Sequence, residues 1–92
     1  MPSLHRQQYS FQGRVQGVGF RATACSIAGR FSVTGWVRNE PDNSVTLQVQ
    51  GAPEVITAFI AELQRTMARN VTSVTHIDLS NVSGETTFST RR

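Results

Sequence analysis

The 92-residue chain contains no lysine, so all nine of its basic residues are arginines. Without lysine there is no Schiff-base nucleophile and no phosphate loop of the Walker type, which requires one. Arginine stays charged at physiological pH and binds phosphate or carboxylate through two parallel hydrogen bonds. The sequence therefore excludes two lysine-based classes of site and leaves arginine to bind anions. A compositional preference for arginine over lysine would also explain the absence.

Cysteine and long apolar runs are also scarce. Cys25 is the only cysteine, so no disulfide can form within the chain and an oxidising compartment is not indicated. We expect it to be a small buried side chain rather than a reactive thiol. No signal peptide is visible, and the longest apolar run is far too short to span a membrane. The cytoplasm is the expected location.

Residues for acid–base or metal chemistry are few. The chain has two histidines and six acidic residues. Neither His5 nor His76 has a neighbouring cysteine or histidine at the spacing of metal ligands. No two side chains suggest a general acid with a general base, and no nucleophile has an attendant base. The sequence therefore predicts no metal site, and an enzyme built from it must run a reaction that needs no general acid.

The hydrophobic pattern predicts one domain of strands and helices. Residues 1–6 lack periodicity and are expected to form a flexible leader, with a single domain over 7–92. Alternation predicts strands, and apolar residues three and four apart predict helices. The expected strands lie at 7–15, 33–38, 45–49, 74–79 and, more weakly, 86–90; the expected helices run from Arg21 to Phe31 and from about residue 51 to Asn70. This order predicts a ferredoxin-like βαββαβ sandwich, an α+β fold with an antiparallel sheet and both helices on one face.

The segment from Gly13 to Arg21 joins the first strand to the first helix. Gly17 and Gly19 permit positive φ, so that successive amide N–H groups can converge on one point. The first turn of the helix adds free N–H donors and a partial positive charge. Arg21 contributes a full charge and a planar set of donors. The segment therefore predicts an anion-binding loop (an anion cradle), and its most specific interpretation is a phosphate-binding catalytic loop.

Hydrolysis of an acyl phosphate suits this set of residues. The leaving group is a carboxylate whose conjugate acid has a pKa of roughly 4, so it departs at neutral pH without a proton. The protein then has to hold the phosphoryl oxygens and aim a water molecule. Asn39, where the second strand runs out, has an amide that both donates and accepts and can orient that water. The same asparagine is also of the type that caps a turn.

Three segments together resemble the acylphosphatase family in order and spacing: the loop 13–21, the stretch Gly-Trp-Val-Arg-Asn at 35–39, and Val-Gln-Gly at 49–51. The similarity covers about residues 7–90. It implies the ferredoxin-like fold and hydrolysis of the carboxyl–phosphate bond of acyl phosphates to carboxylate and inorganic phosphate. It also implies that Asn39 positions the attacking water and that Arg21 binds the phosphoryl group with the loop amides of Gln16, Gly17, Val18, Gly19 and Phe20.

The resemblance implies no cofactor, no metal and no covalent intermediate. The expected partners are a small acyl phosphate substrate and, as product-like ligands, inorganic phosphate or sulfate. Ala24, Ser32 and Asn43 depart from the family pattern at positions where threonine, glycine and glycine are usual. Because asparagine tolerates positive φ, the turn at Asn43 is expected to survive. These departures bear on rate and stability more than on the type of reaction.

Two other functions remain open on the same fold. The net charge of +3 weakly favours a non-catalytic anion- or RNA-binding module. However, RNA readers of this fold display stacking aromatics on the open sheet face, and the seven aromatic residues here do not form that signature. A domain acting beside a larger carbamoyl-phosphate enzyme is the other possibility. We expect a monomer without nucleic-acid or membrane partners.

Overall fold

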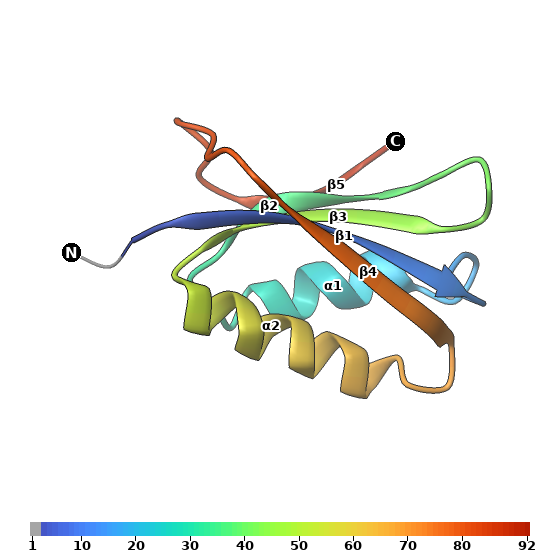
Figure 1. Cartoon of the computed structure of the whole chain (residues 1–92). Helices are drawn as coiled ribbons and strands as arrows, with labels where there is room; N and C mark the ends of the chain where they lie inside the picture. The colour runs from blue at the N-terminus through green and yellow to red at the C-terminus, as the bar shows by residue number, and fades with distance from the viewer. Residues whose placement is uncertain (1–2) are drawn as a thin grey trace.

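The computed structural model describes residues 3–92 and contains one five-stranded sheet covered on one face by two helices (Figure 1). The strands, in the order β4-β1-β3-β2-β5 across the sheet, are β1 (His5–Gly13), β2 (Thr34–Asn39), β3 (Val45–Gly51), β4 (Val71–Leu79) and β5 (Phe88–Arg91). The helices are α1 (Phe20–Ala28) and α2 (Pro53–Thr66). The predicted ferredoxin-like sandwich is confirmed.

The core fills the space between the sheet and the helices. Side chains alternate across a strand, so one set of residues from each central strand points towards the helices. The same layer receives the apolar stripe of each helix. The largest fully buried side chains come mostly from β1, β3 and α2 and include Phe11, Leu47, Val49, Phe59 and Leu63.

The sequence predicts an antiparallel sheet, but the sheet is mixed. The pairs β1–β3, β1–β4 and β2–β3 are antiparallel. The last strand, β5, instead runs parallel to β2, with Gly35 opposite Phe88 and Arg38 opposite Arg91. The alternation of a strand does not encode the direction of its neighbour, so this pairing could not be read from the pattern. Its consequence is that β2 and β5 end side by side.

Two strands begin earlier than predicted. The expected leader covers residues 1–6, but His5 and Arg6 already belong to β1; the first two residues of that leader lie outside the described residues. Likewise, β4 begins at Val71. The start of β1 was missed because Arg6 is charged yet only 3% exposed, which no hydrophobic pattern indicates.

Both helices end before the predicted residues. The first, α1, ends at Ala28 rather than Phe31, and α2 ends at Thr66 rather than Asn70. Met67 is still buried although it follows the last helical residue. The apolar spacing therefore continues beyond α2 and made the helix look longer than it is.

A cluster of polar side chains fastens the loop between β4 and β5 to the sheet. Figure 1 shows this loop on the side of the sheet opposite the helices. The guanidinium of Arg6 donates to the Glu85 carboxylate through two hydrogen bonds of 2.9 and 3.2 Å. It also donates to Gln48 Oε1 at 2.9 Å and to Gln50 Oε1 at 3.2 Å. Gln50 in turn exchanges two hydrogen bonds, of 2.9 and 2.8 Å, with the backbone of Val82. This cluster fixes the segment that leads into β5.

Glu85 is ionised in the folded protein. Burial raises the pKa of its carboxyl, but hydrogen bonds from Arg6 and Thr34 and the charges of Arg6 and Arg91 outweigh burial and lower the pKa below the ordinary 4.5. A pKa lower in the folded than in the unfolded chain stabilises the fold above the unfolded value. That contribution is lost as the pH falls through the lowered pKa.

We therefore expect Glu85→Gln to lower the free energy of unfolding by about 2 kcal/mol at neutral pH, because the buried Arg6 loses its charged partner. The difference from wild type should shrink in acid, as the wild-type carboxyl is protonated. Urea unfolding between neutral pH and pH 3 measures it. Glu62→Gln, which removes an ion-paired carboxylate on the surface of α2, should leave stability near wild type. Equal stability of Glu85→Gln and wild type at neutral pH would contradict the expectation.

Candidate active site

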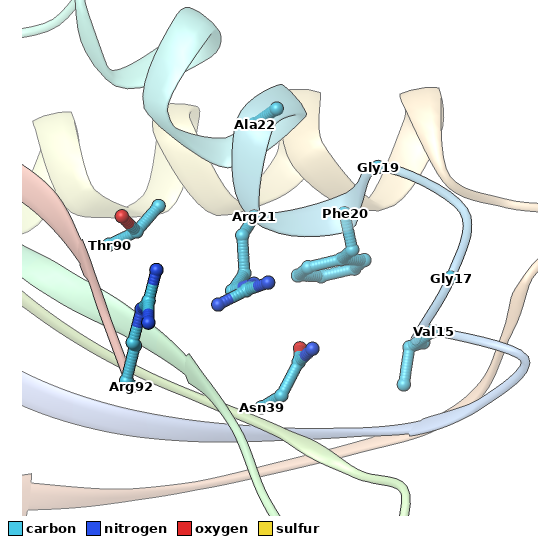
Figure 2. Close-up of a pocket in the computed structure, with 9 residues that line it drawn as sticks. All are labelled: Val15, Gly17, Gly19, Phe20, Arg21, Ala22, Asn39, Thr90 and Arg92. Carbon is cyan, nitrogen blue, oxygen red and sulfur yellow. The ribbon is translucent and has the colours of Figure 1, made fainter.

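A pocket of about 410 Å³ lies where the loop after β1, the start of α1 and the ends of β2 and β5 meet (Figure 2). Its lining consists of Val15, Gly17, Gly19, Phe20, Arg21, Ala22, Asn39, Thr90 and Arg92. Both residues predicted to act on substrate, Arg21 and Asn39, are among them. In Figure 2 the side chain of Arg21 extends from the start of α1 towards the side chain of Asn39. The fold thus brings together two residues far apart in the sequence.

The glycine loop enters α1 through left-handed backbone. Gly17 has φ 75° and Gly19, the N-cap of α1, has φ 77°. A Cβ at either position would meet no atom within 4 Å, so glycine is favoured here by its φ and not by lack of space. The N–H of Thr23 bonds to the carbonyl of Gly19 at 2.9 Å and begins the helical ladder. Because no side chain caps α1, the amides of its first turn are available to a ligand.

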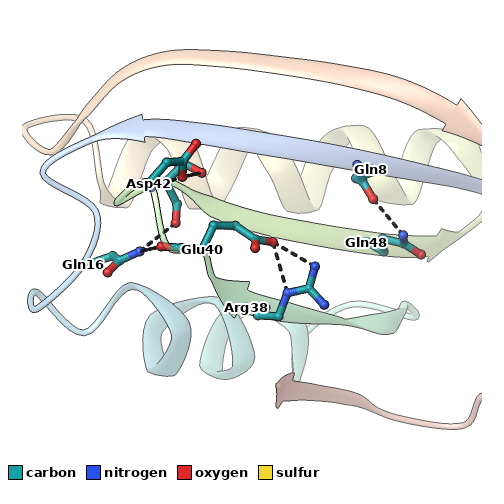
Figure 3. A network of polar contacts seen from close by, with 7 residues as sticks. Gln8, Gln16, Arg38, Glu40, Asp42 and Gln48 are labelled. Carbon is teal, nitrogen blue, oxygen red and sulfur yellow. Dashed lines mark hydrogen bonds and ion pairs between the residues drawn. The ribbon is translucent and has the colours of Figure 1, made fainter. Parts of the chain in front are cut away.

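Two loop residues predicted to bind phosphate do not line the pocket. The side-chain amide of Gln16 donates to the backbone carbonyls of Glu40, at 2.8 Å, and Ser44, at 2.9 Å (Figure 3). Val18 packs against the hydrophobic core. Both side chains therefore anchor the loop, one to the turn between β2 and β3 and one to the core. Binding by their backbone amides stays a prediction.

The carboxylates of Glu40 and Asp42, which follow Asn39, already accept hydrogen bonds from neighbouring residues. Hydrogen bonds from Thr46 and Arg38 lower the pKa of Glu40, whose carboxylate accepts from Arg38 at 3.1 and 2.9 Å (Figure 3). Hydrogen bonds from the hydroxyl and the N–H of Ser44, 2.6 and 3.0 Å long, lower the pKa of Asp42. Both carboxylates are ionised at neutral pH, so neither is suited to donate a proton. The turn itself keeps its shape as expected, since Asn43 adopts φ 74°.

Sequence reasoning missed two residues of the pocket, Thr90 and Arg92. Thr90 belongs to β5, which runs parallel to β2, and Arg92 follows that strand. Arg21 reaches the same segment, since its guanidinium lies 3.5 Å from the carbonyl oxygen of Arg91. Successive side chains of a strand point to opposite faces. Thr90 and Arg92 thus face the pocket, whereas Arg91 lies over the Trp36 ring at 4.7 Å. This alternation was visible in the sequence, but only the strand pairing makes it informative.

The other side chains that could take part in acid–base or nucleophilic chemistry lie outside the pocket lining. His76 stacks on Tyr9 with ring centroids 5.0 Å apart and does not line the pocket. Cys25 is half-buried, and burial raises the pKa of its thiol. Within residues 3–92, no three histidine, cysteine or acidic side chains gather into a possible metal site. Neither helix in this range has the length and apolar character needed to cross a membrane.

Known proteins match the chain along nearly its whole length. The family model for acylphosphatases matches residues 7–90. An acylphosphatase of Thiobacillus denitrificans is 44% identical over 85 residues, which are 92% of this chain and 90% of that protein. An acylphosphatase of Methanospirillum hungatei is 39% identical over 94 residues, covering 97% and 99% of the two chains. The crystal structure of acylphosphatase from Bacillus subtilis superposes with a TM-score of 0.84 at 25% identity, covering 98% of this chain and all of that one. The chain belongs to the acylphosphatase family.

Proposed function

We propose that this chain hydrolyses the carboxyl–phosphate bond of acyl phosphates, giving a carboxylate and inorganic phosphate. The observation that carries the proposal is the convergence, in one pocket, of Arg21, Asn39 and the uncapped first turn of α1. The N-terminus of a helix carries a partial positive charge and free N–H donors, both suited to a phosphoryl group. Membership of the acylphosphatase family supports the same reaction.

Each part of the pocket has a role in this reaction. The amides of the glycine loop and the guanidinium of Arg21 hold the phosphoryl oxygens, which carry the negative charge in the transition state. The amide of Asn39 holds a water molecule opposite the leaving group. The water oxygen bonds to phosphorus while the phosphorus–oxygen bond to the acyl group breaks, and that electron pair leaves on the carboxylate. The proton from the water passes to the phosphate product or to solvent.

The leaving group removes the need for a general acid. The conjugate acid of a carboxylate has a pKa of about 4, so the carboxylate departs unprotonated. This agrees with a pocket lining that contains no histidine, cysteine or acidic residue. We therefore propose that the reaction is independent of metal ions and proceeds by positioning and electrostatic stabilisation alone.

Purified protein is expected to hydrolyse acetyl phosphate at the same rate with and without EDTA. Phenyl phosphate, whose leaving group has a conjugate-acid pKa of about 10, should react far more slowly because no group in the pocket protonates it. Phosphate release measures both rates. Inorganic phosphate and sulfate should inhibit competitively, since each resembles the phosphoryl end. Loss of activity on chelation would contradict metal independence, and no hydrolysis of acetyl phosphate would contradict the proposed function.

The open sheet face does not favour RNA binding. Trp36, an aromatic residue of β2, is only 6% exposed. The guanidinium groups of Arg38 and Arg91 lie 4.9 and 4.7 Å from its ring centroid. A covered ring is not available to stack on a base. The arrangement thus supports the catalytic function over the RNA-binding alternative.

A further inference from the structure

The pocket has two ends. In Figure 2 the glycine loop lies on one side, Thr90 and Arg92 lie on the other, and Arg21 and Asn39 lie between them. The proposed hydrolysis uses the loop, Arg21 and Asn39, and gives no role to the side formed by Thr90 of β5 and by Arg92, which follows β5. A volume of about 410 Å³ is within the range that encloses a whole small molecule. The side of Thr90 and Arg92 is therefore available to the acyl part of the substrate.

This side carries a positive charge that no acidic residue neutralises. The ion pairs within residues 3–92 involve Arg6, Arg30, Arg38 and Arg65, and none of them includes Arg92. None of the nine residues that line the pocket is acidic. Two guanidinium groups, those of Arg21 and Arg92, thus border one cavity beside the positive end of α1. Because Arg92 lies on the side of the pocket away from the glycine loop, its charge favours a ligand that carries negative charge on that side as well as at its phosphoryl end.

The last strand directs Arg92 into the pocket. Arg91 stacks over Trp36 on the open face of the sheet and pairs in register with Arg38. Its carbonyl oxygen lies 3.5 Å from the Arg21 guanidinium that donates to it. With Arg91 fixed on one face, alternation turns the side chains on either side of it to the other face. Thr90 and Arg92 line the pocket for this reason.

We propose that Arg92 binds a second anionic group on the acyl part of the substrate, so that the preferred substrates are acyl phosphates whose acyl chain carries a carboxylate. This rests on the proposed function and deepens it. The Arg92 guanidinium binds the distal carboxylate through charge-assisted hydrogen bonds, and the Thr90 hydroxyl donates to the same group. Arg21 and the loop amides hold the phosphoryl end. Arg92 is then a specificity residue, because it contacts the acyl part of the substrate and not the reacting atoms.

Succinyl phosphate and butyryl phosphate test this, because they have the same number of carbons and differ in the terminal carboxylate. After subtraction of spontaneous hydrolysis, wild type should show a higher kcat/KM for succinyl phosphate. Arg92→Gln should lower that value about tenfold, mainly through KM, and should lower the value for butyryl phosphate much less. Thr90→Val should produce a smaller loss with the same selectivity. Arg69→Gln, which removes an exposed charge outside the pocket, should change neither substrate.

Three results would overturn the inference. An equal loss on both substrates would assign Arg92 to the phosphoryl group. No loss on either, or no preference in the wild type, would leave Arg92 without a role in specificity. Hydrolysis of butyryl phosphate by Arg92→Gln shows that the variant is folded, so a selective loss cannot come from unfolding. Failure of the wild type to hydrolyse either compound would instead overturn the proposed function, and this inference with it.

Discussion

Arg21→Gln is expected to lower kcat/KM for acyl phosphates by about a thousandfold. Arg21 lies on the first turn of α1 and lines the pocket, where its guanidinium provides a full positive charge. Loss of one donor from a preorganised anion site costs about 10²–10³ in rate, and a charged, two-pronged donor belongs at the upper end of that range. Glutamine keeps a hydrogen-bond donor but loses the charge. Most of the loss should appear in kcat, because negative charge is held most strongly in the transition state.

The matched control is Arg14→Gln, which removes the same charge from an exposed position in the same loop, outside the pocket lining. We expect it to retain nearly full activity. Steady-state kinetics on acetyl phosphate, with both variants at equal net charge, separates the local role of Arg21 from the overall field of the protein. Unchanged activity of Arg21→Gln, or an equal loss in Arg14→Gln, would contradict the assignment.

Arg21 also offers a test on stability. A cation at the N-terminus of a helix is disfavoured by the helix dipole, and α1 has no acidic residue in its first turn to compensate. Arg92 lines the same pocket and adds like charge. Arg21→Gln should therefore unfold at the same temperature as wild type or at a slightly higher one. A rate loss without a loss of stability is what a residue retained for binding an anion should show.

The elements of the site that follow local rules could be predicted from the sequence. Glycines at positions of positive φ, followed by a helix start, mark an anion cradle without any knowledge of the rest of the fold. Asn39 was identified because it ends a strand within a specific short segment. In the structure, Gly17, Gly19, Arg21 and Asn39 do line one pocket.

The elements that depend on pairing between distant segments could not be predicted. Thr90 and Arg92 enter the pocket only because β5 runs parallel to β2, and a strand's own sequence does not specify its partner. The early start of β1 depends on Glu85, which lies far along the chain and neutralises Arg6. The anchoring of the glycine loop by the Gln16 side chain, which donates to carbonyl groups of the turn between β2 and β3, was equally invisible in the sequence.

Asn39→Ala is expected to lower kcat by about 10²-fold or more while changing the inhibition constant of inorganic phosphate only a few-fold. Asn39 is the last residue of β2, paired with Val45, and its side chain points into the pocket (Figure 2). An amide that orients the attacking water contributes once the water moves towards phosphorus, and little to holding phosphate in the ground state. Steady-state kinetics and phosphate inhibition measure the two effects separately. Normal turnover in this variant would remove Asn39 from the mechanism.

Asn39→Asp distinguishes water positioning from turn capping. Aspartate caps turns as well as asparagine does, so a residue kept only for the turn would tolerate the change and leave activity intact. In the proposed mechanism the change removes the amide donor and places a negative charge beside the phosphoryl group, which it repels. We therefore expect Asn39→Asp to lose at least as much activity as Asn39→Ala. Activity retained in the aspartate variant and lost in the alanine variant would mean that Asn39 shapes the turn before Ser44 and does not hold the water.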